Sequence, residues 1–298
     1  MTEAEPDLET LTKGLVYLLD VEPVTAPDHY VGHRRPGGVG RVFGGQVVGQ
    51  ALMAASKTVA QDRPVHSLHC YFLRPASEDH PIDFEVAADM DGRAFSSRRV
   101  VARQREKVIF SMTASFHHGE RGPAHGAAMP DVPPPEDLRD LPALIRAGAF
   151  PSSPGLRRMA TRASPIEIRP TGPVQSGRFE EERSAHAACW MRIGTGALGL
   201  GQAMQRAMLA FASDMLLLST AYRPHGLQIG GPGVVSASID HSVWFHGDVA
   251  CGDWLLYATD SPFAGDGRGF ARGHFFNRAG QLIASVAQEG LIRLRDEA

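Results

Sequence analysis

The chain has 298 residues, a formal net charge of −3 and 43% hydrophobic residues. This length fits one large domain or two ordinary ones, and the composition excludes a disordered chain and argues against a nucleic-acid-binding protein. The three cysteines, Cys70, Cys189 and Cys251, are far apart and lack a CxxC spacing, so we expect no disulfide framework and no metal site. So few cysteines fit a reducing, cytoplasmic setting, and no apolar stretch is long enough to span a bilayer.

Residues 1–117 predict one buried helix followed by an antiparallel meander. A short amphipathic helix is indicated at 9–20, and the Gly-, Pro- and His-rich residues 24–40 predict a loop. Small and apolar residues on all sides of 45–59 are typical of a buried helix. Strand patterns follow at 65–73, 82–90, 94–104 and 107–117.

Residues 118–170 differ in composition from the rest of the chain. They contain ten prolines, a density that excludes a continuous core element and predicts a linker. At most short helices fit there, such as one at 135–148.

Residues 171–298 repeat the pattern of the first 117. A strand at 186–193 precedes a helix at 199–223, the strongest helical pattern of the chain. Its apolar residues recur every three or four positions: Leu200, Met204, Met208, Phe211, Met215 and Leu218. Strand patterns follow at 234–245, 254–261, 269–276 and 282–292.

Two short motifs suggest that these halves are copies of one fold. Residues 43–48 and 211–216 both start with Phe inside an apolar helix pattern, and a Gly-Arg-x-Phe motif begins at Gly92 and again at Gly267. The separations, 168 and 175 residues, differ by only a few residues, as expected for a repeat with loop-length changes. Composition and pattern therefore predict an α+β repeat, in which the second copy has Asp214 where the first has Gln46.

Two polar residues occupy positions where apolar ones are expected, and a third lies on a polar strand face. Asp214 lies in the middle of the predicted helix, where its same-face neighbours are all apolar. Gln288 falls on the inward face of the last strand, and Ser238 on a strand face rich in hydroxyls. A carboxylate can deprotonate a water that a hydroxyl and an amide position. The alternatives are a structural Asp bonded to a loop and a core Gln with satisfied hydrogen bonds; no G-x-S-x-G motif supports a serine nucleophile.

Gly44, Gly45 and Gln46 open the first buried helix, where glycines give a ligand access to the N–H groups of the helix N-terminus. Such a site suits a thioester oxyanion or a phosphate, and tight helix packing is the alternative explanation. His66 and His69 lie on opposite faces of one strand, so that strand cannot present both to one metal. We expect both to line the substrate pocket.

His241 and four arginines are further candidates for the site. His241 falls on an apolar strand face and is interpreted as structural or pocket-lining. Four arginines are candidates for phosphate contacts, although surface arginines are usually solvated: Arg98, Arg99, Arg268 and Arg272.

Several of these motifs together resemble the type II acyl-CoA thioesterases, the family of bacterial thioesterase II and its peroxisomal relatives. In the first half the resemblance lies in VFGGQVVGQA at 42–51 and VHSLHCYF at 65–72. In the second half it lies in ASD at 212–214, IDHSVWFH at 239–246 and VAQEG at 286–290. It covers about residues 11–293 and fails mainly in the Pro-rich segment.

The resemblance implies a double hotdog fold and hydrolysis of medium- to long-chain acyl-CoA to a fatty acid and CoA, with no cofactor. The Asp, Thr or Ser, and Gln that this family uses fall on Asp214, Ser238 and Gln288. Some members have Thr where this chain has Ser238, which keeps the hydroxyl. Exposed sheet edges favour a homodimer or a dimer of dimers. A non-catalytic acyl-CoA-binding protein is the alternative, and a hotdog enoyl-CoA hydratase a weaker one, because no D-x-N-P-x-H pattern is present.

Overall fold

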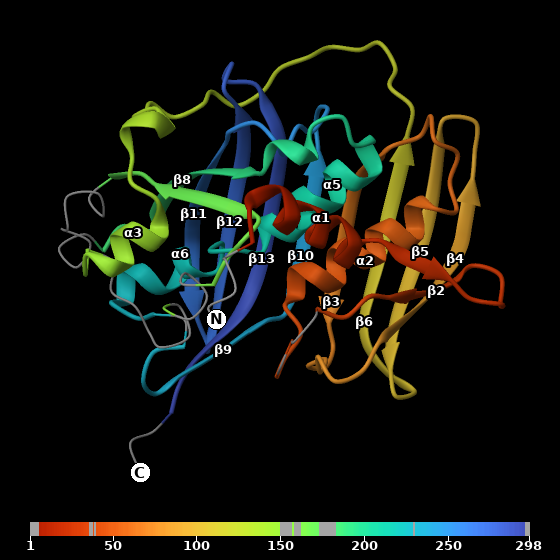
Figure 1. Cartoon of the computed structure of the whole chain (residues 1–298), viewed down its shortest axis with the longest axis horizontal. Coiled ribbons are helices and arrows are strands. Elements are labelled where there is room, and N and C mark those ends of the chain that lie inside the picture. Colours follow the sequence, from red (N-terminus) through yellow and green to blue (C-terminus); the bar gives the residue numbers. More distant parts are fainter. Residues whose placement is uncertain are drawn as a thin grey trace.

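The computed structural model describes residues 6–35, 38, 40–149, 157, 162–172, 183–228 and 230–295. These residues form one long antiparallel sheet of thirteen strands, with the main helices side by side across one face of it (Figure 1). The first half of the chain occupies the right of this view and the second half the left.

The first half contains two helices and six strands. Helix α1 (Leu8–Leu19) is capped by the Asp7 carboxylate, which accepts a hydrogen bond from the Thr10 N–H at 2.8 Å. Helix α2 (Gly44–Ser56) is buried along almost its whole length. The strands are β1 (Val21–Pro23), β2 (His29–Gly32), β3 (Val65–Phe72), β4 (Ile82–Asp91), β5 (Phe95–Gln104) and β6 (Lys107–His117).

The second half follows a similar order, with three helices and seven strands in its described residues. A short helix α3 (Leu141–Arg146) precedes strands β7 (Ile166–Pro170) and β8 (His186–Ile193). Helix α5 (Gln202–Ser213) packs against α2, and a single turn α6 (Ser219–Tyr222) follows. The remaining strands are β9 (Val234–Ser238), β10 (Asp240–Phe245), β11 (Leu255–Gly265), β12 (Arg268–Asn277) and β13 (Leu282–Leu294).

The strand order proves the repeat. It runs β2-β4-β5-β6-β3 in one half and β10-β13-β12-β11-β8 in the other, so the second half mirrors the first about the β3–β10 pair. These two central strands are antiparallel, with Leu68 opposite Val243. One helix wrapped by an antiparallel meander, twice, confirms the predicted α+β double hotdog fold.

The predicted continuous helix at 199–223 is wrong. Helix α5 ends at Ser213, Asp214 is its C-cap, and Leu216 adopts a left-handed φ of 65° that no α-helix tolerates. The apolar periodicity continues into α6 because this turn is also buried, in a separate cluster of Leu218, Ala221 and Tyr222, so the pattern conceals the break. Asp214 therefore lies at a helix end and not in a helix middle.

The proposed equivalence of residues 43–48 and 211–216 is also wrong. Gln46 lies in the first turn of α2, whereas Asp214 follows the last turn of α5. The two segments meet because α2 and α5 are antiparallel neighbours: a Cβ on Gly45 would lie 2.4 Å from the Phe211 carbonyl oxygen. The copies correspond through their strands and helices and not through this motif.

Two short strands lie in segments that were predicted to be irregular. Strand β2 lies within the predicted loop 24–40, and β7 lies at the end of the predicted linker 118–170. Strand β7 sits at the edge of the sheet, a place where strands tolerate proline. Residues 150–156 and 158–161 of that linker fall outside the described residues, as do 1–5 and 296–298 of the two predicted repeats.

Candidate active site

The C-terminal end of α5 meets the N-terminal end of α2, and Asp214 lies at this junction. Its Oδ2 accepts a hydrogen bond of 2.8 Å from the Gly45 N–H. A Cβ on Gly44 would lie 2.8 Å from the same Oδ2. The two glycines thus let the helices approach closely, and the anion that the α2 N-terminus holds is the Asp214 carboxylate of the chain itself.

Helix dipoles explain why a carboxylate is tolerated here. The C-terminal end of α5 carries partial negative charge, which disfavours an anion at the Asp214 position. The N-terminal end of α2 carries partial positive charge and faces the same carboxylate through the Gly45 N–H. Asp214 is also only partly buried, so it keeps contact with the solvent side of the junction.

Gln288 joins Asp214 to Ser238. Its side chain is 1% exposed, which confirms its predicted inward position on β13. Its amide nitrogen donates to Asp214 Oδ1 at 3.0 Å and to Ser238 Oγ at 2.6 Å. Both amide hydrogens are therefore used, and the carboxylate and the hydroxyl are held on either side of one nitrogen.

A β-bulge brings Ser238 and His241 to the same amide. Against β13, Ser238 of β9 lies opposite Gly290, whereas Ser242 of β10 lies opposite Ala287. One extra residue is therefore inserted between β9 and β10. Such a bulge reverses the alternation of side chains, as bulges beside active sites commonly do. The predicted single strand 234–245, with Ser238 and His241 on opposite faces, is wrong for this reason.

His241 holds the other end of the Gln288 amide. Its Nδ1 lies 3.0 Å from Gln288 Oε1 and its Nε2 lies 2.8 Å from Ser213 Oγ. The carboxylate of Asp214 can only accept, so the amide nitrogen must face it and the amide oxygen must face His241. His241 Nδ1 is therefore a donor. Complete burial lowers the pKa of His241, although the nearby Asp214 charge opposes this shift, and the Ser213 hydroxyl beside Nε2 also donates to the Ala210 carbonyl at 2.9 Å.

Two buried side chains next to His241 donate hydrogen bonds to backbone carbonyls. Tyr257 Oη donates to the Ser213 carbonyl at 2.8 Å, and Cys70 Sγ donates to the His241 carbonyl at 3.1 Å. Burial raises the pKa of Cys70 well above its usual value, so this thiol stays protonated and is no candidate nucleophile. The sequence placed His241 on the inward face but gave no sign of its contact with Gln288.

The structure does not bring the two predicted pocket histidines to this cluster. His69 is exposed on the other face of the sheet, where Nδ1 lies 3.1 Å from Ser242 Oγ beside the ring of Trp244. His66 bonds Ser115 Oγ at 2.8 Å and lies against Phe95 and His117. Burial is the main cause that lowers the pKa of each imidazole.

Gln46 is buried in the first turn of α2, and its side chain bonds the loop at His33 and not the Asp214 cluster. Its amide nitrogen lies 3.4 Å from the His33 carbonyl, and its backbone N–H donates to Phe43 at 3.1 Å. The predicted ligand site consisted of the backbone N–H groups of Gly44, Gly45 and Gln46. Those of Gly45 and Gln46 donate to acceptors within the chain.

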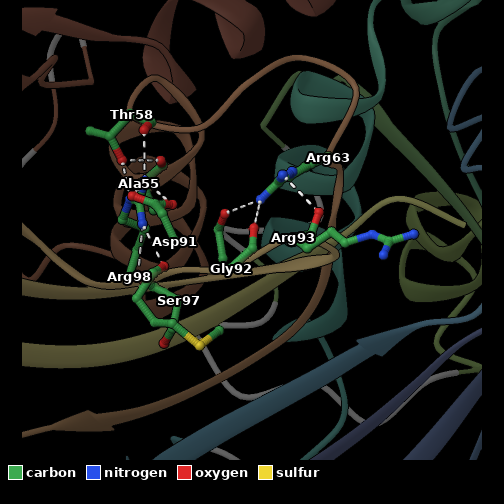
Figure 2. A network of polar contacts seen from close by, with 10 residues as sticks. Ala55, Thr58, Arg63, Asp91, Gly92, Arg93, Ser97 and Arg98 are labelled. Carbon is green, nitrogen blue, oxygen red and sulfur yellow. Dashed lines mark hydrogen bonds and ion pairs between the residues drawn. The ribbon is translucent and has the colours of Figure 1, made fainter.

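Each of the four arginines considered for phosphate contacts forms an ion pair. Arg99 pairs with Asp89, Arg268 with Glu289, and Arg272 with Asp260. Arg98 is buried and binds Asp91 at 2.9 Å and Thr58 Oγ1 at 2.8 Å, which ties the end of α2 to the β4–β5 turn (Figure 2). The guanidinium groups of these four arginines therefore already bind carboxylates of the chain.

Two features are absent from the described residues. No group of three or more His, Cys, Asp or Glu side chains in this part of the chain could hold a metal ion. No helix that the structure describes is both long and apolar enough to cross a membrane.

Comparison with known proteins gives the same family in both halves. Residues 164–291 match the acyl-CoA thioesterase family, and residues 33–117 match the N-terminal domain of acyl-CoA thioesterases. Acyl-coenzyme A thioesterase 8 of Homo sapiens is 39% identical over 86% of this chain and 82% of its own. Acyl-CoA thioesterase 2 of Haemophilus influenzae is 35% identical over 97% of this chain and 100% of its own.

A solved structure and a more distant relative extend this comparison. The crystal structure of the acyl-CoA thioesterase II TesB2 from Mycobacterium marinum is similar with a TM-score of 0.77 and 34% identity, covering 94% of this chain and 98% of that one. A Saccharomyces cerevisiae relative named peroxisomal acyl-coenzyme A thioester hydrolase 1 is 23% identical over 98% of this chain and 97% of its own. The chain therefore belongs to the acyl-CoA thioesterase II family and is an acyl-CoA thioester hydrolase.

Proposed function

We propose that the protein hydrolyses medium- to long-chain fatty acyl-CoA through a water held by Asp214, Ser238 and Gln288, with Asp214 as the general base. The observation that carries this proposal is the Gln288 amide nitrogen, which bonds both Asp214 Oδ1 and Ser238 Oγ. Three groups from α5, β9 and β13 thus converge on one point, although they lie far apart in sequence.

The chemistry follows from which atoms donate. Ser238 Oγ accepts from Gln288, so its own hydrogen is left to donate to a water or to the thioester carbonyl. Asp214 takes a proton from the water while the water oxygen attacks the carbonyl carbon of the thioester. The C–S bond then breaks, the fatty acid forms, and CoA leaves as a thiolate that takes up a proton.

A serine acyl-enzyme fits this geometry poorly. A serine nucleophile needs a base that removes its proton, and the group bonded to Ser238 is an amide nitrogen, which is no base. The imidazole of His241 contacts Gln288 and Ser213 instead. Water attack is therefore the better mechanism.

The oxyanion needs at least one preorganised donor. Among the described residues, none accepts a hydrogen bond from the N–H of Gly44, which stands at the first position of α2 beside Asp214. The positive end of the α2 dipole points the same way. We assign this N–H to the thioester oxyanion, a role whose loss typically costs about 100- to 1000-fold in rate.

We expect one active site per chain. The residue of the first repeat that matches Asp214 by position is Lys57, the C-cap of α2. Its ammonium pairs with Asp20 at 2.9 Å. The symmetric junction thus has a cation where the second has a carboxylate, and active-site titration should find one site.

Chain-length preference is inferred from the surroundings of Asp214. Phe43 packs edge to face on Phe211 with ring centroids 5.1 Å apart, and Phe72 and Met215 also flank the core here. Such surfaces suit an aliphatic chain. Thiol release from a ladder of acyl-CoAs tests the proposal: rates should rise from short to medium and long chains, and no release from any member would contradict it.

We propose a cytoplasmic homodimer or dimer of dimers. Strands β1 and β7 are the ends of the described sheet, and sheet edges favour association. Sedimentation of the purified chain and fractionation of the producing cells test the two parts; a monomer, or recovery in an organelle like that named for the yeast relative, would contradict them.

A further inference from the structure

A groove of about 490 Å³ lies between residues 40–41, the loop after β3 and the β5–β6 turn, and its lining has an excess of cations. Its charged lining is Arg41, Arg74, Arg105 and Lys107 against the single carboxylate of Asp79. The whole chain has a net charge of −3, so this concentration of positive charge is local and opposite to the overall sign.

These four cations differ from the arginines discussed above because none of them is held in an ion pair within the described residues. Across the described ranges, no ion pair joins Arg41, Arg74, Arg105 or Lys107 to an Asp or Glu, and all four are exposed. Arg74 donates one N–H to the Val108 carbonyl at 2.6 Å. This bond holds the guanidinium in place and leaves its other donors available.

The groove is held together by side-chain hydrogen bonds. Gln104, at the end of β5, accepts from the Ser77 N–H at 2.8 Å and donates to the carbonyls of Ser77 at 2.8 Å and His80 at 2.9 Å. These bonds fix the loop after β3 against the β5–β6 turn. On the other side, the Val42 N–H donates to Ala76 at 3.0 Å. The cations are therefore presented on braced segments.

The chain connects this groove directly to the reacting centre. Arg41 precedes Gly44 by three residues, so their Cα atoms are at most about 11 Å apart. Arg74 follows Phe72 by two residues, and Phe72 Cζ lies 3.1 Å from the Cβ position of Gly44. Gly44 in turn adjoins Asp214. A substrate whose thioester lies at Asp214 can thus extend past the start of α2 into the groove.

We infer that this groove binds the phosphates of the CoA moiety, an inference that rests on the proposed hydrolysis of acyl-CoA. A diphosphate and a ribose phosphate together carry roughly three to four negative charges at neutral pH. They are separated from the thioester by the long pantetheine arm, which places them at the surface. Arginine and lysine side chains are the usual partners of phosphate, and a cationic groove also raises the local concentration of an anionic substrate.

The test compares two thioesters of one fatty acid: acyl-CoA, and the acyl thioester of N-acetylcysteamine, which has no phosphate. The variant carries Arg105→Glu and Lys107→Glu on the exposed β5–β6 turn. We expect KM for acyl-CoA to rise roughly tenfold, a change within the range of electrostatic steering, while KM for the phosphate-free thioester stays the same. The rise should shrink at high salt.

A matched control makes the same change of charge elsewhere. Arg93→Glu and Arg121→Glu alter two exposed cations near the opposite end of β5; the Arg93 side chain points away from its neighbours in Figure 2. This pair should leave both KM values unchanged. A control that raises KM for acyl-CoA as much, a groove variant that alters both thioesters alike, or one that alters neither would each overturn the inference.

Two further arms complete the design. Acyl-dephospho-CoA, which lacks the 3′-phosphate, shows which phosphate is bound. If its KM is the same in wild type and the groove variant, the groove binds the 3′-phosphate. If its KM rises in the variant as it does for acyl-CoA, the groove binds the diphosphate. Wild-type protein that releases no thiol from either thioester would refute the proposed function itself, a result distinct from failure of the groove.

Discussion

The His241–Gln288 contact allows a sharp test of how the site is organised. His241 touches neither the proposed water nor the substrate; it is a positioning residue that fixes which end of the Gln288 amide faces Asp214. Two substitutions separate its two contacts. The amide nitrogen of Asn can reach the place of imidazole Nδ1, and that of Gln the place of Nε2. His241→Asn therefore retains the bond to Gln288, and His241→Gln retains only the contact with Ser213.

The expected size follows from the burial of the acceptor. In His241→Gln, Gln288 Oε1 loses its donor in a site that is 1% exposed. An unsatisfied buried acceptor costs about 1–3 kcal/mol. If the amide escapes this cost by turning over, its oxygen faces the Asp214 carboxylate and the water site is lost. The fall in kcat is then roughly 5- to 150-fold, at about 1.36 kcal/mol for each factor of ten.

The assay is thiol release at saturating acyl-CoA, with urea unfolding of each variant alongside. We expect kcat to fall in His241→Gln with KM little changed, and to stay within a few fold of wild type in His241→Asn. Because both variants lose one contact of the imidazole, a general loss of packing would lower both equally. Equal kcat values in the two variants, or a wild-type kcat in His241→Gln, would refute the positioning role.

Three other predictions concern the same site. Ser238→Thr should keep kcat within several fold because the hydroxyl remains, whereas Ser238→Ala should lower it by about 10- to 100-fold if the hydroxyl holds the water; equal activity of both in the thiol assay would exclude that role. Gly45→Ala should lower the free energy of unfolding by about 1–3 kcal/mol, because its Cβ would meet the Phe211 backbone at 2.4 Å, whereas Gly14→Ala, with nothing within 4 Å, should raise it by up to about 1 kcal/mol; urea denaturation that finds no difference would contradict the close helix contact. Burial lowers the pKa of His241 in the native state below the unfolded value of 6.5, so the unfolded chain binds more protons and stability should fall as the pH drops below about 6.5; His241→Asn should make this fall shallower, and an unchanged slope would mean that other groups cause it.

Much of the fold could be predicted because its signals are local. Alternation of apolar and polar residues, with Gly and Asn turns between, placed β6 and β8 with the bounds that the structure shows. The break after α5 could not be predicted, since the left-handed φ of Leu216 leaves no trace in the periodicity. Strands β2 and β7 were missed because they are short and lie among glycines and prolines.

The site was predicted in part. Asp214 and Gln288 stood out because polar groups occupied core-like positions, and the resemblance to a family joined them with Ser238 into one set. Their contacts depend on the helix end at Asp214 and on the bulge after Ser238, which are tertiary features. The His241–Gln288 bond depends on that bulge as well, so strand parity in the sequence separated His241 from Ser238. The positions of His66 and His69 likewise depend on the curvature and faces of the finished sheet.

The role of Asp214 as base is tested most directly by single-turnover thiol release with wild type and Asp214→Asn, both saturated with the same acyl-CoA. The Asn side chain keeps the shape but offers one acceptor to the two donors, Gly45 and Gln288, so unfolding free energies are measured in parallel. Asp260→Asn, which breaks the exposed pair with Arg272, is the matched control. We expect Asp214→Asn to lower the rate by about 10²- to 10⁴-fold in a folded protein while the control keeps the wild-type rate. A folded Asp214→Asn variant that releases thiol at the wild-type rate would contradict the account.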